Sequence, residues 1–204
     1  MNVKAKLVVV TGKWGPGDGY KHQVDEYCRR VEETGFFERD NIFCYSESPE
    51  YVLQDERFSR HLWYRSDPND MSVRGAGYWF QKSVTVRHHM DLIEDGALII
   101  WADVDRIDFF RQGTFNALLE TMERRGADFS IEHQGGLENG WTKEDALRAF
   151  NATPSMRETK QVNANAWVVR NSASMRKFLD AVIECVADWH MVSDDPSVFP
   201  NRRE

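Results

Sequence analysis

The chain has 204 residues, of which 41% are hydrophobic, enough for one full-sized globular domain with a substantial core. Its formal net charge is -7, and no run of Lys or Arg is long enough to follow a phosphate backbone, which excludes nonspecific binding to nucleic acid. Three widely spaced cysteines without a CxxC pair fit neither a disulfide framework nor a zinc site and indicate a reducing, cytoplasmic compartment.

The amino terminus and the hydropathy pattern predict no membrane insertion. The first charged residues, MNVKAK, precede only four apolar residues, too few for a signal peptide. No stretch approaches the roughly 20 apolar residues of a membrane span. We therefore expect a cytoplasmic protein without a transmembrane segment.

Short apolar runs alternate along the chain with segments of helical periodicity. Several runs are apolar throughout, as in strands that are buried on both faces. The predicted strands are 7–10, 42–45, 61–64, 98–101, 128–131 and 167–169. Strands that alternate with helices form βαβ units, so the sequence predicts an α/β domain whose mostly parallel central sheet is covered by helices on both faces.

Apolar residues recur at helical spacing in three segments, 24–31, 115–122 and 175–186. Gly35 is expected to end the first of these helices, and Ser172 to cap the start of the last.

Residues 133–165 differ from the rest because they are polar and loop-rich, and only one short helix is expected there, at 142–150. A long excursion of this kind inside a compact domain is usually functional.

Two carboxylates follow the central predicted strand. Asp103 and Asp105 lie just after residues 98–101, and residues two apart in extended chain project to the same side. Their repulsion requires a proton or a cation between them, and Mg²⁺ and Mn²⁺ prefer oxygen ligands that they share with substrate phosphates. The alternative is that the pair only begins a turn and caps a helix.

A hydrophobic strand that ends in Asp-x-Asp, midway through a chain that opens with "VVVTG", resembles the glycosyltransferases of the GT-A fold. The segment "GAGYWFQKSVTVRHHMDLIEDGALIIWADVD" is similar to a subgroup with Gly-Tyr-Trp-x-x-Lys about twenty residues before the acidic pair. That subgroup includes bacterial polysaccharide enzymes and capsid-glycan glycosyltransferases of large algal viruses. The resemblance runs from the first strand to about residue 198 and is specific only in this central segment.

The resemblance implies one Rossmann-like GT-A catalytic domain over residues 1–204. It implies a metal-dependent glycosyltransferase of the hexosyltransferase type, which moves a sugar from a UDP-sugar to a glycan, polysaccharide or glycoprotein acceptor. In GT-A enzymes the acidic pair holds Mn²⁺ or Mg²⁺ on the donor diphosphate. Asp103 would then contact the ribose or the metal, and Asp105 the metal. If the protein is viral, the location implied is the host cytoplasm.

Further donor contacts are assigned by the same resemblance. Lys82 and Arg74 are candidate cations for phosphate or sugar, with solvated surface charge as the alternative. Tyr78 and Trp79 would stack on a base or a sugar ring, unless they pack beneath the following helix.

At the end of the first strand, Thr11 and Gly12 match the place where GT-A proteins admit the nucleoside. The glycines of the next loop, Gly15, Gly17 and Gly19, are expected to make it mobile.

Two later segments supply the remaining candidates. Asn163 and Asn165 precede a predicted strand and would contact sugar hydroxyls, although Asn is also ordinary loop chemistry. Asp194 or Asp195 would be a general base for the acceptor hydroxyl, with a turn before Pro196 as the simpler explanation.

Related sequences continue into a motif with His and Asp, whereas this chain stops at Glu204, and the resemblance therefore leads us to expect a truncated chain or the first domain of a longer protein. This leaves a third metal ligand open. The histidines available are His88, His89, His133 and His190.

Three other classes of protein are alternatives. A haloacid-dehalogenase-like phosphatase would use Asp103 as nucleophile, but its motif usually lies near the amino terminus, with Thr or Val where this chain has Ile107. A Rossmann dehydrogenase needs a third glycine where this chain has Tyr20 or His22. A non-catalytic nucleotide-sugar-binding domain would bind the donor without turnover.

Overall fold

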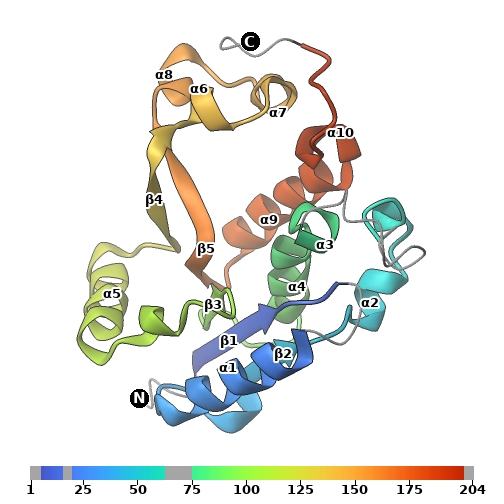
Figure 1. The fold of residues 1–204 in the computed structure, drawn as a ribbon. Coiled ribbons are helices and arrows are strands. Elements are labelled where there is room, and N and C mark those ends of the chain that lie inside the picture. Colours follow the sequence, from blue (N-terminus) through green and yellow to red (C-terminus); the bar gives the residue numbers. More distant parts are fainter. Residues whose placement is uncertain (1–5, 16–19, 63–74, 200–204) are drawn as a thin grey trace.

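A computed structural model of the chain describes residues 6–15, 20–62 and 75–199. These residues form a five-stranded sheet with the order β2-β1-β3-β5-β4 (Figure 1). The strands are β1 (Leu7–Gly12), β2 (Ile42–Tyr45), β3 (Leu98–Ala102), β4 (Phe129–Leu137) and β5 (Lys160–Arg170).

The sheet is parallel in its β2-β1-β3 part, and the connection from β1 to β2 runs through α1 (Lys21–Glu33). β5 pairs antiparallel with β3, and β4 pairs antiparallel with β5. The predicted α/β class is therefore confirmed, and the arrangement is consistent with a GT-A-like fold.

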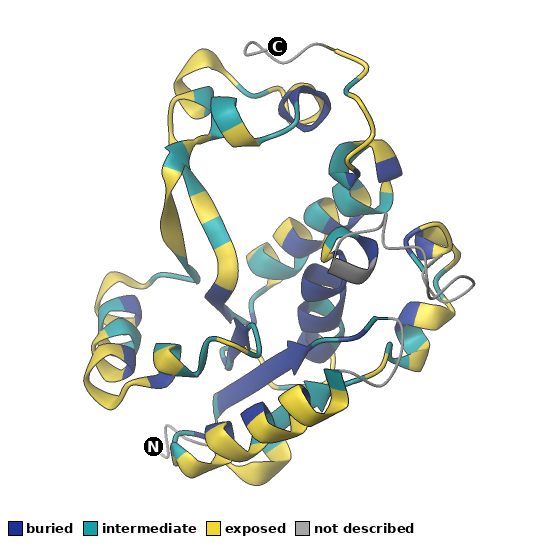
Figure 2. Ribbon diagram, viewed as in Figure 1, coloured by how far each residue is buried: buried dark blue, intermediate teal, exposed yellow. Residues whose placement is uncertain are grey.

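Helices cover both faces of the sheet, as predicted. Side chains of successive strand residues alternate between two apolar clusters: Val9 and Ile100 belong to one, Val10 and Ile99 to the other. The first cluster packs against α1 and α5 (Gln112–Arg125), the second against α4 (Gln81–Met90) and α9 (Ala173–Ala187). Figure 2 shows β1 and α4 as the most continuously buried elements.

The helical segments expected from periodicity are confirmed in α1, α5 and α9. Gly35 has a φ of 69°, a left-handed value that glycine adopts without steric cost, and it follows the last residues of α1. Ser172 caps α9, since its Oγ accepts the backbone N–H of Met175.

The sequence of helix α4 shows no amphipathic pattern. The helix is buried on nearly every side, although most of its residues are polar. Several of its buried polar groups have partners inside the protein. His89 donates from Nδ1 to the Thr85 carbonyl at 2.8 Å, and its Nε2 lies 3.2 Å from the Tyr45 hydroxyl. Each buried polar group without a partner would cost roughly 1–3 kcal/mol of folding stability. The stability of this helix therefore depends on the residues packed around it.

The strand predicted at 61–64 is wrong where the structure describes it. His61 and Leu62 lie in a turn after η4 (Glu56–Phe58), and residues 63 and 64 lie outside the described residues. His61 is fully buried against the Phe80 and Trp189 rings, and its Nε2 lies 2.8 Å from the Val186 carbonyl oxygen. An aromatic cluster, and not a sheet, buries His61.

The excursion at 133–165 contains the outer halves of two strands. β4 and β5 continue past the other strands as a two-stranded arm, with short helices at its end (Figure 1). The helix expected at 142–150 is α7 (Glu144–Ala149). The two other short helices were not predicted, and they are α6 (Glu138–Trp141) and α8 (Pro154–Arg157).

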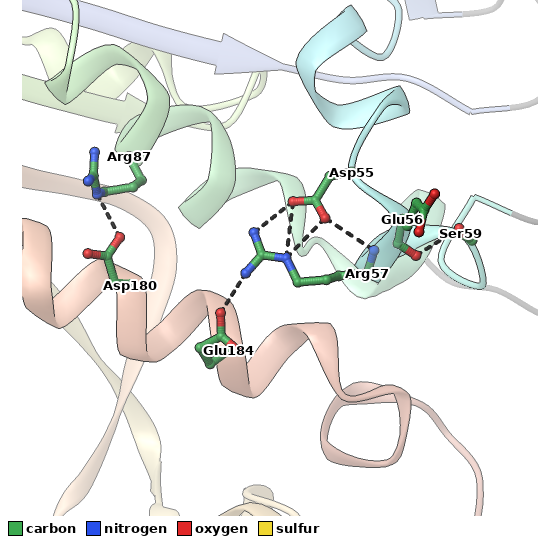
Figure 3. Close-up of polar contacts among 7 residues, drawn as sticks. All are labelled: Asp55, Glu56, Arg57, Ser59, Arg87, Asp180 and Glu184. Carbon is green, nitrogen blue, oxygen red and sulfur yellow. Dashed lines mark hydrogen bonds and ion pairs between the residues drawn. The ribbon is translucent and has the colours of Figure 1, made fainter.

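Ion pairs fasten α9 to its neighbours. The Arg57 guanidinium lies between Asp55, at 2.7 Å, and Glu184 of α9, at 2.5 Å, and Arg87 of α4 donates from Nε to Asp180 at 2.7 Å (Figure 3). The remaining short elements are η3 (Arg39–Asn41), α2 (Glu50–Leu53), α3 (Gly75–Tyr78), η6 (Ile107–Phe110) and α10 (Trp189–Val192). Within the described ranges, no helix combines the length and the apolar character that crossing a membrane requires.

Candidate functional site

The acidic pair lies where the sequence predicted it, directly after β3. The backbone N–H of Asp103 donates to the Asn165 carbonyl at 2.8 Å, and its own carbonyl accepts the Arg106 N–H at 2.8 Å, which turns the chain into η6. The carboxyl ends of β1 and β3 meet at this edge because the two strands are parallel neighbours. This is the edge at which open α/β sheets bind ligands.

A lysine neutralises the first carboxylate. Lys82 Nζ, from the first turn of α4, lies 2.8 Å from Asp103 Oδ2 and donates a second bond to the Ala164 carbonyl at 3.1 Å. The other carboxylate oxygen, Oδ1, accepts the indole N–H of Trp101 at 2.7 Å. The Lys82 side chain is 11% exposed and that of Asp103 25%, so the pair is shielded from water but open on one side.

Burial dominates the electrostatics of this cluster. Desolvation lowers the pKa of the Lys82 ammonium, and the negative charges of Asp103 and Asp105 act in the opposite direction. Below the site, burial raises the pKa of the Tyr27 phenol, and Cys44, Asp103 and Asp105 raise it further. Lys82 therefore lies within the field of both carboxylates, although it bonds only to the first.

Thr11 and Gly12 contact protein groups. Thr11 is fully buried, and its hydroxyl donates to the Ala102 carbonyl at 2.6 Å, which joins the ends of β1 and β3 just before Asp103. The missing side chain of Gly12 makes room for the Trp14 ring, because a Cβ there would lie 2.5 Å from Trp14 Cζ3. Nucleoside binding at these two residues stays a prediction. Gly15 lies against the Tyr20 ring, whereas Gly17 and Gly19 lie outside the described residues.

The two asparagines shape the bend that brings β5 to the acidic pair. Asn163 Oδ1 accepts the backbone N–H of Asn165 at 3.0 Å, a local turn at a register shift between β4 and β5. The Asn165 carbonyl in turn accepts the Asp103 N–H. Asn165 is exposed beside the site. Asn163 thus makes the turn contact that the alternative predicts, and sugar contact at Asn163 and Asn165 stays a prediction.

Tyr78 and Trp79 occupy a strained turn between α3 and α4. Gly77, Tyr78 and Trp79 have φ values of 103°, 59° and 59°, and such values are rare for bulky side chains. The Tyr78 ring packs edge-on against Trp189 at 5.4 Å, while Trp79 is 46% exposed. The Lys82 N–H donates to the Trp79 carbonyl at 3.2 Å, so this turn starts the helix that carries Lys82. Arg74 lies outside the described residues.

Asp194 and Asp195 follow α10, and both are exposed. Asp195 Oδ2 accepts the Trp189 indole N–H at 2.7 Å and lies 3.5 Å from Arg60. The indole bond is the main reason why the pKa of the Asp195 carboxyl is lowered. A carboxylate with a lowered pKa is a weaker base, and a general base at this place stays a prediction.

The side chains at the end of β3 can hold a divalent ion only if a bound substrate supplies further oxygen ligands. No group of three His, Cys, Asp or Glu in the described ranges can hold a metal. His89 is bonded inside the fold and His88 stacks on Tyr51 at 3.7 Å, so neither points to a metal site. Asp105 is exposed and accepts no hydrogen bond from a described residue. One or two carboxylates completed by substrate phosphates and water is a common Mg²⁺ arrangement, which Asp105 fits.

Fold and site together define a mixed α/β protein with a lysine-neutralised Asp-x-Asp at the carboxyl edge of its parallel strands. No protein-family model matches the chain. No curated protein matches it either. A solved structure that resembles it is a glycosyltransferase involved in the glycosylation of the major capsid of PBCV-1, at 10% identity and a TM-score of 0.45. The match covers 87% of this chain and 65% of that structure, so this chain spans less than two thirds of its neighbour.

Proposed function

We propose that the protein is a glycosyltransferase that uses a nucleotide-diphosphate sugar, with UDP-sugar as the expected donor and a glycan or glycoprotein as acceptor. The observation that carries the proposal is the arrangement at the end of β3: a free carboxylate on Asp105, two residues from a carboxylate that is already paired with Lys82. A cation and an acidic group side by side suit a diphosphate bound through a divalent ion.

The contacts support a separate role for each residue. Asp105 would hold Mn²⁺ or Mg²⁺, with Asp103 as a second oxygen donor or as the ribose contact, and the ion would supply Lewis-acid neutralisation of the leaving diphosphate. The Lys82 ammonium would add a fixed positive charge on the same side of the site. Trp79 would stack on the base or sugar, and Asn165 would contact a sugar hydroxyl.

The test is calorimetric binding of UDP to the purified protein, once with Mn²⁺ and once with excess chelator. Binding that requires Mn²⁺ and is lost in Asp105→Ala is expected. Asp108→Ala is the matched control, because Asp108 is also an exposed carboxylate, three residues further on, whose partner is Arg106 at 3.3 Å. Unchanged UDP binding and turnover in Asp105→Ala with Mn²⁺ would overturn the proposal.

The other classes give different outcomes. If UDP fails to bind in both conditions, GDP and dTDP are tested next, followed by phosphate release from small phosphoesters. A phosphatase would need the Asp103 carboxylate as nucleophile, yet both of its oxygens accept hydrogen bonds, which lowers their nucleophilicity. Metal-dependent UDP binding without hydrolysis or transfer from any sugar donor would indicate a non-catalytic binding domain.

A further inference from the structure

Trp101, the fourth residue of β3, contacts both members of the charged pair. Its indole N–H donates to Asp103 Oδ1 at 2.7 Å, and Lys82 Nζ lies 5.9 Å from the centre of its ring. Trp101 is fully buried, so its indole N–H has little access to water. An indole N–H only donates, and therefore its partner must be an acceptor, which is Asp103 Oδ1.

The carboxylate of Asp103 is consequently held at two points. Oδ1 is fixed by Trp101 and Oδ2 by Lys82, so rotation about the bond that carries the carboxylate would break one of the two. Charge-assisted hydrogen bonds of this kind are the stronger ones in proteins. Packing alone would require a large apolar residue at position 101, whereas the hydrogen bond requires the indole N–H.

We propose that Trp101 is a positioning residue of the donor site, whose indole N–H orients the Asp103 carboxylate so that Lys82 and the donor meet it in one geometry. The role of Trp101 in donor binding rests on the proposed function. Its orientation of the Asp103 carboxylate is independent of that function and is measured separately.

The fold supplies a matched control. Trp167 of β5 lies directly opposite Trp101 in the β3–β5 register, and it is 6% exposed. Its indole nitrogen is buried and has no hydrogen-bond partner among the residues that the structure describes. Trp167 therefore fills space on the same face without orienting a carboxylate. Trp→Phe at either position removes comparable volume, but only Trp101→Phe removes a hydrogen bond.

The first measurement needs no ligand. In ¹H–¹⁵N spectra of the protein, the indole N–H signal of Trp101, assigned by its loss in Trp101→Phe, is expected to move strongly in Asp103→Ala, whereas that of Trp167 stays in place. A Trp101 signal that does not respond to Asp103→Ala would overturn the proposal whether or not the protein binds UDP.

The second measurement is UDP affinity with Mn²⁺ by calorimetry, on variants shown to be folded. Trp101→Phe is expected to weaken binding about tenfold, as for one lost bond to a charged group, and Trp167→Phe less than twofold. In an Asp103→Ala background Trp101→Phe should add nothing, because Trp101 acts through that carboxylate. Equal losses of UDP affinity in Trp101→Phe and Trp167→Phe would overturn the proposal. Additive losses in the variant that combines Trp101→Phe with Asp103→Ala would also overturn it. Absence of UDP binding in the unaltered protein contradicts the proposed function and leaves the spectral result to decide the orientation of Asp103.

Discussion

Lys82 Nζ lies 2.8 Å from Asp103 Oδ2, and this bond joins the first turn of α4 to the end of β3. It explains why two carboxylates stand at the end of a buried strand: the protein itself supplies the cation for one of them. The second carboxylate, on Asp105, is exposed and has no bonded partner among the described residues. The fold thus neutralises only one of the two carboxylates.

Lys82→Met is expected to lower both donor affinity and the free energy of unfolding. The substitution leaves the Asp103 carboxylate shielded from water without its cation, at a cost of about 2 kcal/mol, less than for a fully buried pair because Asp103 is 25% exposed. Denaturant unfolding measures the loss. Lys177→Met, at an exposed position of α9, is the control and should change stability by less than about 0.5 kcal/mol. Equal stability of the two variants would contradict a stabilising Lys82–Asp103 pair.

Asp195→Asn is expected to reduce turnover less than tenfold, because the carboxylate is already engaged by Trp189 and Arg60 and its pKa is lowered. Loss of a general base typically costs about 10²–10⁴-fold. Comparison with Asp194→Asn in a sugar-transfer assay decides between the two predicted bases. A loss above a hundredfold in Asp195→Asn alone would assign the base to Asp195.

Gly77→Ala is expected to destabilise the protein more than Gly96→Ala. Both glycines have positive φ, 103° and 85°, so each alanine adds backbone strain of about 1 kcal/mol. A Cβ on Gly77 would also lie 2.8 Å from the His61 carbonyl oxygen and the Phe80 ring, whereas a Cβ on Gly96 meets nothing within 4 Å. The difference in unfolding free energy therefore isolates the close approach. Indistinguishable variants would show that the turn before α4 can relax.

Acid is expected to destabilise the end of the β4–β5 arm through Glu144. Its bonds to Arg157 and Arg148 lower the pKa of the Glu144 carboxyl from 4.5 to about 2. A folded-state pKa below the unfolded one means stability that is present above pH 4.5 and is lost as the pH falls toward 2. Between pH 5 and pH 2, the midpoint temperature of thermal unfolding should fall less steeply for Glu144→Gln than for the unaltered protein. Parallel pH profiles for the two proteins would show that this carboxyl does not contribute.

The parts of the fold that the sequence predicted have a local apolar pattern, which is a continuous run in β1 and β3 and helical spacing in α1 and α9. The position of Asp103 and Asp105 followed from β3 alone. Helix α4 could not be recognised, because the bonds that compensate its buried polar groups come from distant residues such as Tyr45, Asp103 and Asp180.

The partners of the site residues were equally hidden in the sequence. Nothing local indicates that the Thr11 hydroxyl bonds to Ala102, or that Trp14 covers Gly12. The Trp101 bond to Asp103 did have a local signal, since residues two apart on a strand share a side, but a tryptophan in an apolar run is ordinarily read as core. Long-range packing thus decides which polar residues serve a ligand and which serve the fold.

The backbone bond from Asp103 to Asn165 has a consequence for folding order. The Lys82–Asp103 pair spans 21 residues and can form once α4 docks on β3, but the Thr11–Ala102 bond spans 91 residues, and Asn165 follows the whole β4 excursion. Loop closure over such separations is slow compared with local pairing. On the ribosome, a nascent chain that has emerged only as far as α5 would carry both carboxylates and their lysine without the β5 backbone that holds them, so this cluster would be complete only after β5 has paired.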